Sequence, residues 1–243
     1  MTWRIRHREV TESTNKDALG GKPGDVFTAG LQTGGRGRLD HKWLSPAGEN
    51  LMMSAVVDVA GAPVNEAVTL PLVAGLSVAQ AVKSVLGKVS CRSDASEVRV
   101  KWPNDVQVAG RKICGILCER NLDSVIIGIG VNVNQVEFDP EISRRATSVR
   151  VETGKTVEVD EVRDAVLRSL SENIAKWRAG GFASLLPDLA QFDCLKGKVI
   201  SVRRTDDDCL PATGICGGIR DDGTLDVAGE AISAGEAHIL GNF

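Results

Sequence analysis

The sequence predicts an α/β (α+β) protein, in which a β-sheet with flanking helices is followed by a small C-terminal β-barrel. Strand-like runs alternate with two long segments that carry apolar residues at helical spacing. From Lys198 onward the pattern changes to short alternating strands, separated by turn signals such as "DDG" and "SAG". So short a segment buries little core alone, and we expect it to pack against the larger domain. We place the domains at 1–194 and 195–243.

The first elements lead into a glycine-rich loop. After a short N-terminal strand, "TESTNKDAL" begins with polar residues that can cap a helix, which places Ser13 and Thr14 at a helix mouth. "DVFTAGLQ" is a short strand ending at the loop, and "ENLMMSAVVDV" is apolar enough to be a buried strand. A helix is expected over Asn65–Gly87, with Pro71 in an early turn and Gly87 at its end.

The middle of the chain alternates like paired strands. "EVRVKWPNDVQVAGRKICGILCE" is expected to form such strands around the turn "AGR", and "SVIIGIGVNVN" another strand, interrupted by Gly128 and Gly130. A second amphipathic helix begins at about Asp160, the expected N-cap, and stops at Gly180–Gly181. The barrel strands are expected at "KVISVRR", "ATGICGGI", "TLDV", "EAIS" and "EAHIL".

The composition is that of a globular protein, with 243 residues, 42% of them hydrophobic and 25% charged. The formal net charge of −3 argues against a protein that mainly coats nucleic acid. No apolar run approaches the roughly 20 residues that span a bilayer, and the N-terminus lacks the hydrophobic core of a signal peptide. We therefore expect a cytoplasmic protein without a nucleic-acid or membrane partner.

The cysteines and histidines predict no metal centre. The six cysteines form no Cys-x-x-Cys pair, and none of the three histidines stands in a paired spacing. In a reducing cytosol the cysteines are most simply small apolar residues.

Four segments could carry chemistry, and the first is "QTGGRGRLDHKW" at Gln32–Trp43. It lacks the Lys and Ser or Thr of a nucleoside-triphosphate P-loop, and no helix pattern follows it as in a dinucleotide fingerprint. It is either a solvated surface loop or a mobile anion clamp. In a clamp the glycines bring backbone N–H groups close to an anion, Arg36 and Arg38 supply charge, and Trp43 stacks on a flat heterocycle.

The second segment is "KWPNDV", in which Lys101, Asn104 and Asp105 project from a kink at a strand end. Together they could bind phosphate, sugar and a divalent ion, although "PND" is also an ordinary turn. In the third segment, "RKICGIL", Lys112 lies in an apolar strand and Gly115 suggests a close backbone approach.

The fourth segment is "GIGVNVN". Its alternate glycines clear one face of a strand and make room for a flat ligand, and Asn132 at its end could read a base edge. All four segments are polar or glycine-rich at strand ends, where a rigid sheet presents ligands.

The quoted motifs together resemble those of biotin protein ligases. "ESTN" at 12–15, "QTGGRGR" at 32–38, "KWPNDV" at 101–106, "RKICGIL" at 111–117 and "GIGVNVN" at 128–134 follow that family's order and spacing. The resemblance covers residues 12 to about 150. It implies a mixed sheet related to class II aminoacyl-tRNA synthetases and lipoate ligases, with an SH3-like C-terminal barrel.

The resemblance also implies the reaction and its participants. Biotin's carboxylate attacks the α-phosphate of ATP, supplied with Mg²⁺, and gives biotinyl-AMP and pyrophosphate. A lysine of a biotin carboxyl carrier domain, of acetyl-CoA carboxylase or a related carboxylase, then takes the biotin. The sequence begins directly with the catalytic domain, without the helix-turn-helix of bifunctional members, so we expect a monofunctional enzyme without repressor activity. Monomer and homodimer are both left open.

The family motifs assign site residues by position. The catalytic residues are Arg38 and Lys112. The biotin-binding residues are Ser13, Thr14, Asn15, Gln32, Gly35, Arg36, Arg38, Lys112, Gly115, Gly128 and Gly130. The ATP-binding residues are Arg38, Trp43, Lys101, Asn104, Lys112 and Asn132, and Asp105 is the expected magnesium ligand. The sequence departs from the family at Asp40 and His41, where Gly-Arg is usual.

Two other functions compete with this one. A lipoate ligase or octanoyl transferase would share the fold, but does not carry the "GRGR" loop in this form. A nucleic-acid-binding module would use the barrel and the segment Gln32–Trp43, called the arginine loop below. However, the barrel segment is acidic at Asp206–Asp208 and Asp221–Asp222.

Overall fold

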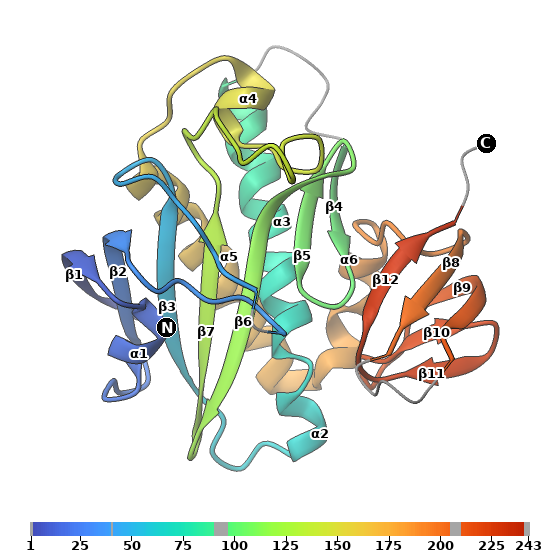
Figure 1. Cartoon of the computed structure of the whole chain (residues 1–243). Helices are drawn as coiled ribbons and strands as arrows, with labels where there is room; N and C mark the ends of the chain where they lie inside the picture. The colour runs from blue at the N-terminus through green and yellow to red at the C-terminus, as the bar shows by residue number, and fades with distance from the viewer. Residues whose placement is uncertain (1, 40, 90–96, 205–209, 241–243) are drawn as a thin grey trace.

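A large mixed sheet and a smaller sheet organise the chain in the computed structural model, which describes residues 2–39, 41–89, 97–204 and 210–240 (Figure 1). The large sheet has seven strands in the order β1-β2-β3-β7-β6-β5-β4. Its strands are β1 (Arg4–Thr11), β2 (Asp25–Gln32), β3 (Leu51–Asp58), β4 (Val98–Lys101), β5 (Asp105–Val108), β6 (Arg111–Asn121) and β7 (Ser124–Val131). The pair β1–β2 is parallel and the other pairs are antiparallel, which confirms a mixed α/β fold.

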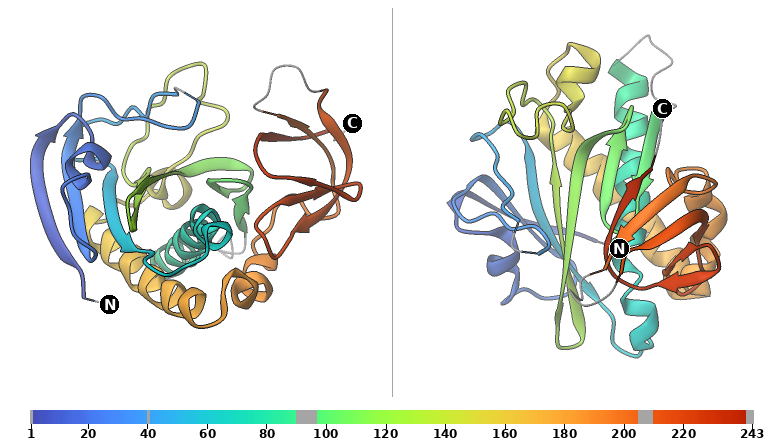
Figure 2. Two further views of the ribbon diagram at one scale, coloured as in Figure 1. Left: turned by 90° about the horizontal axis from the view of Figure 1, so that it is seen from below. Right: turned by 45° about the vertical axis from the view of Figure 1, so that its right-hand side comes forward.

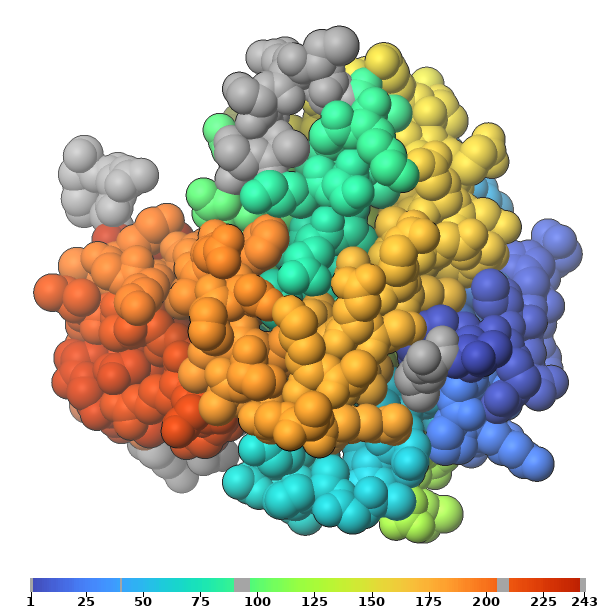
Figure 3. Space-filling model, turned by 180° about the vertical axis from the view of Figure 1, so that it is seen from behind, coloured from blue at the N-terminus to red at the C-terminus, as the bar shows by residue number. Residues whose placement is uncertain are grey.

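Two long helices cover one face of this sheet. The sheet curves around α3 (Leu70–Val89), and α5 (Val159–Gly180) packs against α3 and β3 (Figure 2). From behind, these helices cover the middle of the molecule, while the blue N-terminal strands remain visible at one side (Figure 3). Shorter helices are α1 (Thr14–Ala18), α2 (Val64–Ala67), α4 (Val149–Thr153), η2 (Phe182–Leu185) and α6 (Leu186–Ala190). The main hydrophobic core lies between the long helices and the sheet.

The bounds expected for the helix over 65–87 are wrong at both ends. It is divided into α2 and α3, because Pro71 has no N–H to continue a helix from α2 and instead fits the first turn of α3. Gly87 does not end α3, which runs on to Val89; its backbone is not left-handed and its surroundings are open. Glu158, and not Asp160, is the N-cap of α5, while the expected end at Gly181 is confirmed.

The segment Val64–Val89 also corrects the expectation that no apolar run approaches a membrane-spanning length. It is 26 residues long, and an 18-residue window within it has a mean hydropathy of 1.5, so it meets the requirement by length and composition. However, 72% of its apolar window is buried inside the protein, as is typical of a core helix. This part of the chain therefore contributes to the core.

The second sheet contains all five strands expected after Lys198. Its order is β11-β10-β9-β8-β12. The strands are β8 (Val199–Arg203), β9 (Ala212–Ile219), β10 (Leu225–Val227), β11 (Glu230–Ile232) and β12 (Glu236–Ile239). The indole N–H of Trp102 donates to the carbonyl of Gly223 at 3.1 Å, so a buried side chain of the large sheet joins the two parts.

The described cysteines are free thiols. Cys114, Cys194 and Cys216 are buried and Cys118 is half-buried, whereas Cys91 and Cys209 lie outside the described residues. Burial raises the pKa of the Cys194 thiol to about 11, so it stays protonated at neutral pH. Within the described ranges, no group of three His, Cys, Asp or Glu side chains could hold a metal ion.

Candidate active site

A cleft lies on the face of the large sheet opposite α3, and its floor is built by strand register. Asp105, Gly115, Gly130 and Met52 are cross-strand neighbours on β5, β6, β7 and β3. Side chains in register on neighbouring strands share one face, so this row points into the cleft. A second row, two residues along, contains Leu117, Gly128 and Ser54.

A β-bulge aims Lys112 into the cleft. Along β5 the pairing advances one residue, from Val106 to Gln107, while along β6 it moves two residues, from Cys114 to Lys112. Without the extra residue, strand alternation would place Lys112 and Gly115 on opposite faces. With it, a Cβ added to Gly115 would lie 3.3 Å from the Lys112 Cε atom. The bulge explains a lysine in an apolar strand.

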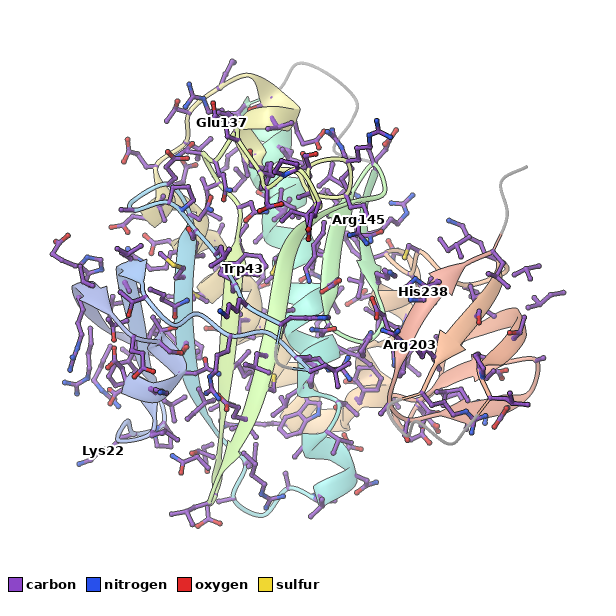
Figure 4. The ribbon with its side chains drawn as sticks, viewed as in Figure 1. Lys22, Trp43, Glu137, Arg145, Arg203 and His238 are labelled. Carbon is purple, nitrogen blue, oxygen red and sulfur yellow. The ribbon has the colours of Figure 1, made fainter. Side chains whose placement is uncertain are left out.

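The floor glycines make room for two side chains of this protein. A Cβ on Gly130 would come within 2.5 Å of the Trp43 indole, and a Cβ on Gly128 within 2.3 Å of the Asn15 amide. Figure 4 shows Trp43 in front of β7. The glycines therefore clear the sheet face as expected, but the space directly above them is filled from within the chain. The Trp43 Nε1 atom is buried without a hydrogen-bond partner among the described residues.

A neutral polar cluster occupies the α1 end of the cleft. Gln32 Oε1 accepts the backbone N–H of Thr14 at 2.8 Å and its hydroxyl at 3.0 Å. Buried Ser54 bridges the Thr14 hydroxyl, at 2.7 Å, and the Asn15 Oδ1 atom, at 2.5 Å. Ser13 is the N-cap of α1, but its side chain makes no capping hydrogen bond. The cluster offers hydroxyl and amide groups without net charge.

Cations gather at the other end of the cleft. Lys112 Nζ lies 2.7 Å from Asp105 Oδ1, in a geometry that makes an ion pair rather than a hydrogen bond, and 5.9 Å from the centre of the Trp43 ring. The Arg38 guanidinium donates to Asn104 Oδ1 at 3.4 Å. Burial lowers the pKa of Arg38, and the carboxylates of Asp105 and Glu236 oppose that shift.

The arginine loop is a small hairpin that lies across the sheet (Figure 1). The Trp43 N–H donates to the Gly35 carbonyl at 3.0 Å, and Arg36 pairs with Lys42. A Cβ on Gly35 would come within 2.4 Å of the Trp43 carbonyl, so only glycine permits this approach. The backbone of His41 closes the turn with Gly37 and Arg38, while Asp40 lies outside the described residues.

The structure brings most of the predicted residues to this one cleft. Those that line it are Ser13, Thr14, Asn15, Gln32, Arg36, Arg38, Trp43, Lys101, Asn104, Asp105, Lys112, Gly115, Gly128 and Gly130. Gly35 and Asn132 do not line it. Gly35 supports the hairpin from within, and the buried Asn132 donates from its amide to the Thr147 carbonyl at 3.0 Å.

Sequence reasoning missed residues that line the cleft and buried residues that support its lining. Ser54 had no signal, because one serine in an apolar strand is unremarkable until its neighbours are known. Glu236 and its neighbours in the second sheet reach the same cleft across a long sequence separation. Figure 4 shows His238, on the edge strand β12, and Arg203, on the neighbouring β8, at the side of the second sheet nearer the large one. Glu119, which bonds Asn15 and Arg36 without lining the cleft, was also missed, although it lies two residues after the motif "RKICGIL".

A cleft with neutral polar groups at one end and cations at the other suits a small molecule with an uncharged polar head and an anionic tail. The fold and the cleft thus define a small-molecule-binding domain of the mixed α/β class. Residues 8–134 match the model of the biotin/lipoate A/B protein ligase family. The chain belongs to this family.

Known relatives and structures agree with this membership. A biotin–[acetyl-CoA-carboxylase] ligase of Paracoccus denitrificans is 33% identical, over 91% of this chain and 92% of that protein. The bifunctional ligase/repressor BirA of Bacillus spizizenii is 30% identical, over 76% of this chain and 58% of that protein. The biotin protein ligase from Aquifex aeolicus in complex with biotin and ATP superposes with a TM-score of 0.83 at 29% identity, covering 97% and 99% of the two chains.

The chain spans less than two thirds of the length of several curated relatives that it matches, for example 58% of the Bacillus spizizenii protein. The activity of the whole protein is therefore a proposal.

Proposed function

We propose that this protein is a biotin protein ligase, which activates biotin with ATP and transfers it to a lysine of a carrier domain. One observation carries the proposal: a neutral hydroxyl–amide cluster and the Arg38–Lys112 cation pair line opposite ends of a single cleft, under the arginine loop. Relatives named as biotin ligases, and a related structure described as a complex with biotin and ATP, support it.

The neutral cluster is the proposed biotin-head site. The ureido ring of biotin carries both donors and acceptors but no charge, so hydroxyl and amide partners suit it. Ser13, whose hydroxyl does not cap its helix, and Thr14 and Gln32 line this end. We assign Asn15 and Ser54 the role of holding these groups, because both are buried and bonded to other members of the cluster.

The cationic end is the proposed reaction centre. The carboxylate oxygen of biotin forms a bond to the α-phosphorus of ATP, and the bond to pyrophosphate breaks. Two anions must approach within bonding distance, and Arg38 and Lys112 lower the repulsion between them. An amine of the carrier lysine then bonds to the acyl carbon, loses a proton, and displaces AMP. A closed loop also keeps water from hydrolysing the mixed anhydride.

Trp43 and Lys101 are proposed for the nucleotide. Trp43 presents an indole beside Lys112, where a flat base can stack. Lys101 lines the same end and is placed for phosphates. Asn104 is held to β6 by its amide, which donates to the Ile116 carbonyl at 2.8 Å, so its oxygen is fixed toward Arg38. Asn132 is buried, bonded to Thr147 and outside the cleft lining, so we assign it no direct contact with the base.

A magnesium ion held by the protein does not fit the described part of the chain. The Asp105 carboxylate is paired with Lys112, and it belongs to no group of three His, Cys, Asp or Glu side chains in the described residues. Magnesium in nucleotide enzymes is commonly bound through substrate phosphates and one or two carboxylates. We expect magnesium to arrive with ATP, and no step of the reaction depends on Asp105 as its ligand.

Several wider expectations belong to the same proposal. The carrier is the biotin carboxyl carrier domain of a carboxylase, and the protein acts in the cytoplasm. The second sheet, from about residue 195, is an SH3-like barrel that forms a separate domain. The large domain is related to class II aminoacyl-tRNA synthetases.

Exchange of labelled pyrophosphate into ATP tests the proposal without a carrier. With magnesium present, we expect exchange that requires biotin and is not supported by lipoate or octanoate. Exchange with lipoate and not with biotin would identify the lipoate branch of the family instead. Absence of exchange with every acid would contradict adenylation.

A further inference from the structure

One carboxylate connects the arginine loop to the neutral cluster. Glu119, near the end of β6, accepts from the Arg36 guanidinium at 3.0 Å through Oε1. Its other oxygen, Oε2, accepts the Asn15 amide N–H at 2.6 Å. The family motifs give Glu119 no role, and the Arg36 side chain is directed to this carboxylate while Arg38 faces Asn104.

These contacts belong to a chain of hydrogen bonds that begins and ends on the loop. Gln32, at the root of the loop, is bonded to Thr14; Ser54 joins Thr14 to Asn15; and Asn15 leads through Glu119 to Arg36, inside the loop. The orientation of the Asn15 amide is fixed, because its NH₂ group must face the Glu119 carboxylate and its oxygen must face Ser54. Both ends of the chain lie on the loop segment.

We propose that Glu119 is a positioning residue that holds the arginine loop over the cleft and couples its closure to the order of the neutral cluster. Arg36 then acts as a tether, while Arg38 alone of the two carries charge to the reacting groups. The identity of the molecule under the loop rests on the proposed function, but the tether itself does not.

Limited trypsin digestion measures the tether without any ligand. Cleavage of the Arg38–Leu39 bond, followed by mass spectrometry, requires the loop to open. Glu119→Gln keeps an oxygen for Asn15 but loses the charge for Arg36, and Arg36→Gln removes the same contact from the loop side. We expect each variant to be cleaved about two to five times faster than the wild type, as suits a partly exposed ion pair. The double variant should be cleaved at the same rate as the single variants, since all three lack the same contact between Arg36 and Glu119.

Two controls separate the tether from general loosening. Glu161→Gln removes an exposed ion pair with Lys88, between α3 and α5, and should leave the cleavage rate unchanged. In about 1 M salt, where the screening length falls to roughly 3 Å, the wild type should approach the variants. Unchanged cleavage in both single variants, or independent effects that add in the double variant, would overturn the proposal.

Calorimetry with biotin separates this inference from the proposed function. If both are right, Glu119→Gln and Arg36→Gln weaken biotin binding by a similar factor. If the wild type binds no biotin but the cleavage pattern is as expected, the tether stands and the proposed function fails. If biotin binds the wild type and both variants equally, and cleavage is unchanged, the tether fails and the function stands.

Discussion

Arg36 and Arg38 lie two residues apart in one glycine-rich loop and have different surroundings. Arg36 has a half-exposed side chain, 47% accessible, that pairs with Glu119. Arg38 is more enclosed, and burial lowers its pKa. A cation held partly away from water interacts more strongly with a developing negative charge than an exposed one. Residue type and spacing predicted a clamp, but not this division of roles, which depends on partners distant in sequence.

The first prediction concerns Arg38. Arg38→Ala should slow biotin-dependent pyrophosphate exchange by about 100-fold, because a preorganised charge used in the transition state is lost. The matched control is Arg8→Ala, which removes an arginine that pairs with Asp17 on the sheet edge and should leave exchange unchanged. Equal rates in Arg38→Ala and the wild type would exclude the proposed role.

A second prediction compares two glycines. Gly130→Ala places a methyl group within 2.5 Å of the Trp43 indole and must displace it, so exchange should require a higher ATP concentration. Gly87→Ala adds the same methyl group in open space inside α3, where alanine favours a helix by up to about 1 kcal/mol. Urea denaturation should show Gly87→Ala at least as stable as the wild type. An unchanged KM for ATP in Gly130→Ala would contradict the placement of Trp43.

At the scale of elements, strands and helices followed largely from local pattern. β2 coincides with "DVFTAGLQ", and Gly181 ends α5 because its left-handed φ of 66° suits glycine. The bulge in β6 was not predictable, since it changes the facing of Lys112 without altering the apolar pattern. The division of α2 from α3 was missed for a related reason: helical spacing continues through Pro71 although backbone hydrogen bonding does not.

The start of β2, where Asp25 faces Arg4 of the edge strand β1, supplies a prediction with a defined pH dependence. Asp25, whose side chain is 3% exposed, accepts the Lys22 N–H and an Arg4 bond at 2.8 Å, and these contacts hold its pKa below the ordinary value. The ionised Asp25 side chain therefore stabilises the folded protein at pH values above about 3.9, the pKa of an aspartate in the unfolded chain. This contribution is lost as the pH falls through the lower pKa that Asp25 has in the folded protein.

Asp25→Asn should lower the free energy of unfolding by about 1 to 2 kcal/mol at pH 7, and the difference should shrink toward pH 3. Urea denaturation at both pH values measures it. Asp164→Asn, at an exposed ion pair on α5, is the control and should change little. A difference between Asp25→Asn and the wild type that grows as the pH falls would contradict a lowered folded-state pKa for Asp25.

At the scale of the whole molecule, both sheets contribute to one cleft. The carboxylate of Glu236, on β12, lies near enough to Arg38 to oppose the effect of burial, which lowers the pKa of its guanidinium. The Trp102 indole donates a hydrogen bond to the Gly223 carbonyl of the second sheet. The sequence predicted that a small C-terminal unit would pack against the larger domain, on the ground of its small core. It did not predict which surfaces meet, because such contacts join residues more than 100 positions apart, as Trp102 and Gly223 are.

Trp102→Phe should test this junction. The smaller phenyl ring leaves part of the buried indole space unfilled and cannot donate to the Gly223 carbonyl, so the free energy of unfolding should fall by about 1 kcal/mol or more. Hydrogen exchange should become faster around residues 220–225. Trp3→Phe, which removes an indole bond to Ser171 at 2.7 Å far from the second sheet, should lower stability similarly without that local change. Equal protection around 220–225 in Trp102→Phe and the wild type would argue against the junction.

The most direct measurement of the central claim is a crystal structure of the protein incubated with biotin, ATP and magnesium. The cleft should contain biotinyl-AMP, with its ring at Gln32 and Thr14, its acyl phosphate between Arg38 and Lys112, and the loop shut above. A ligand bound elsewhere, or a cleft in which the biotin ring lies beside Lys112 and far from Gln32, would contradict the proposed division of the site.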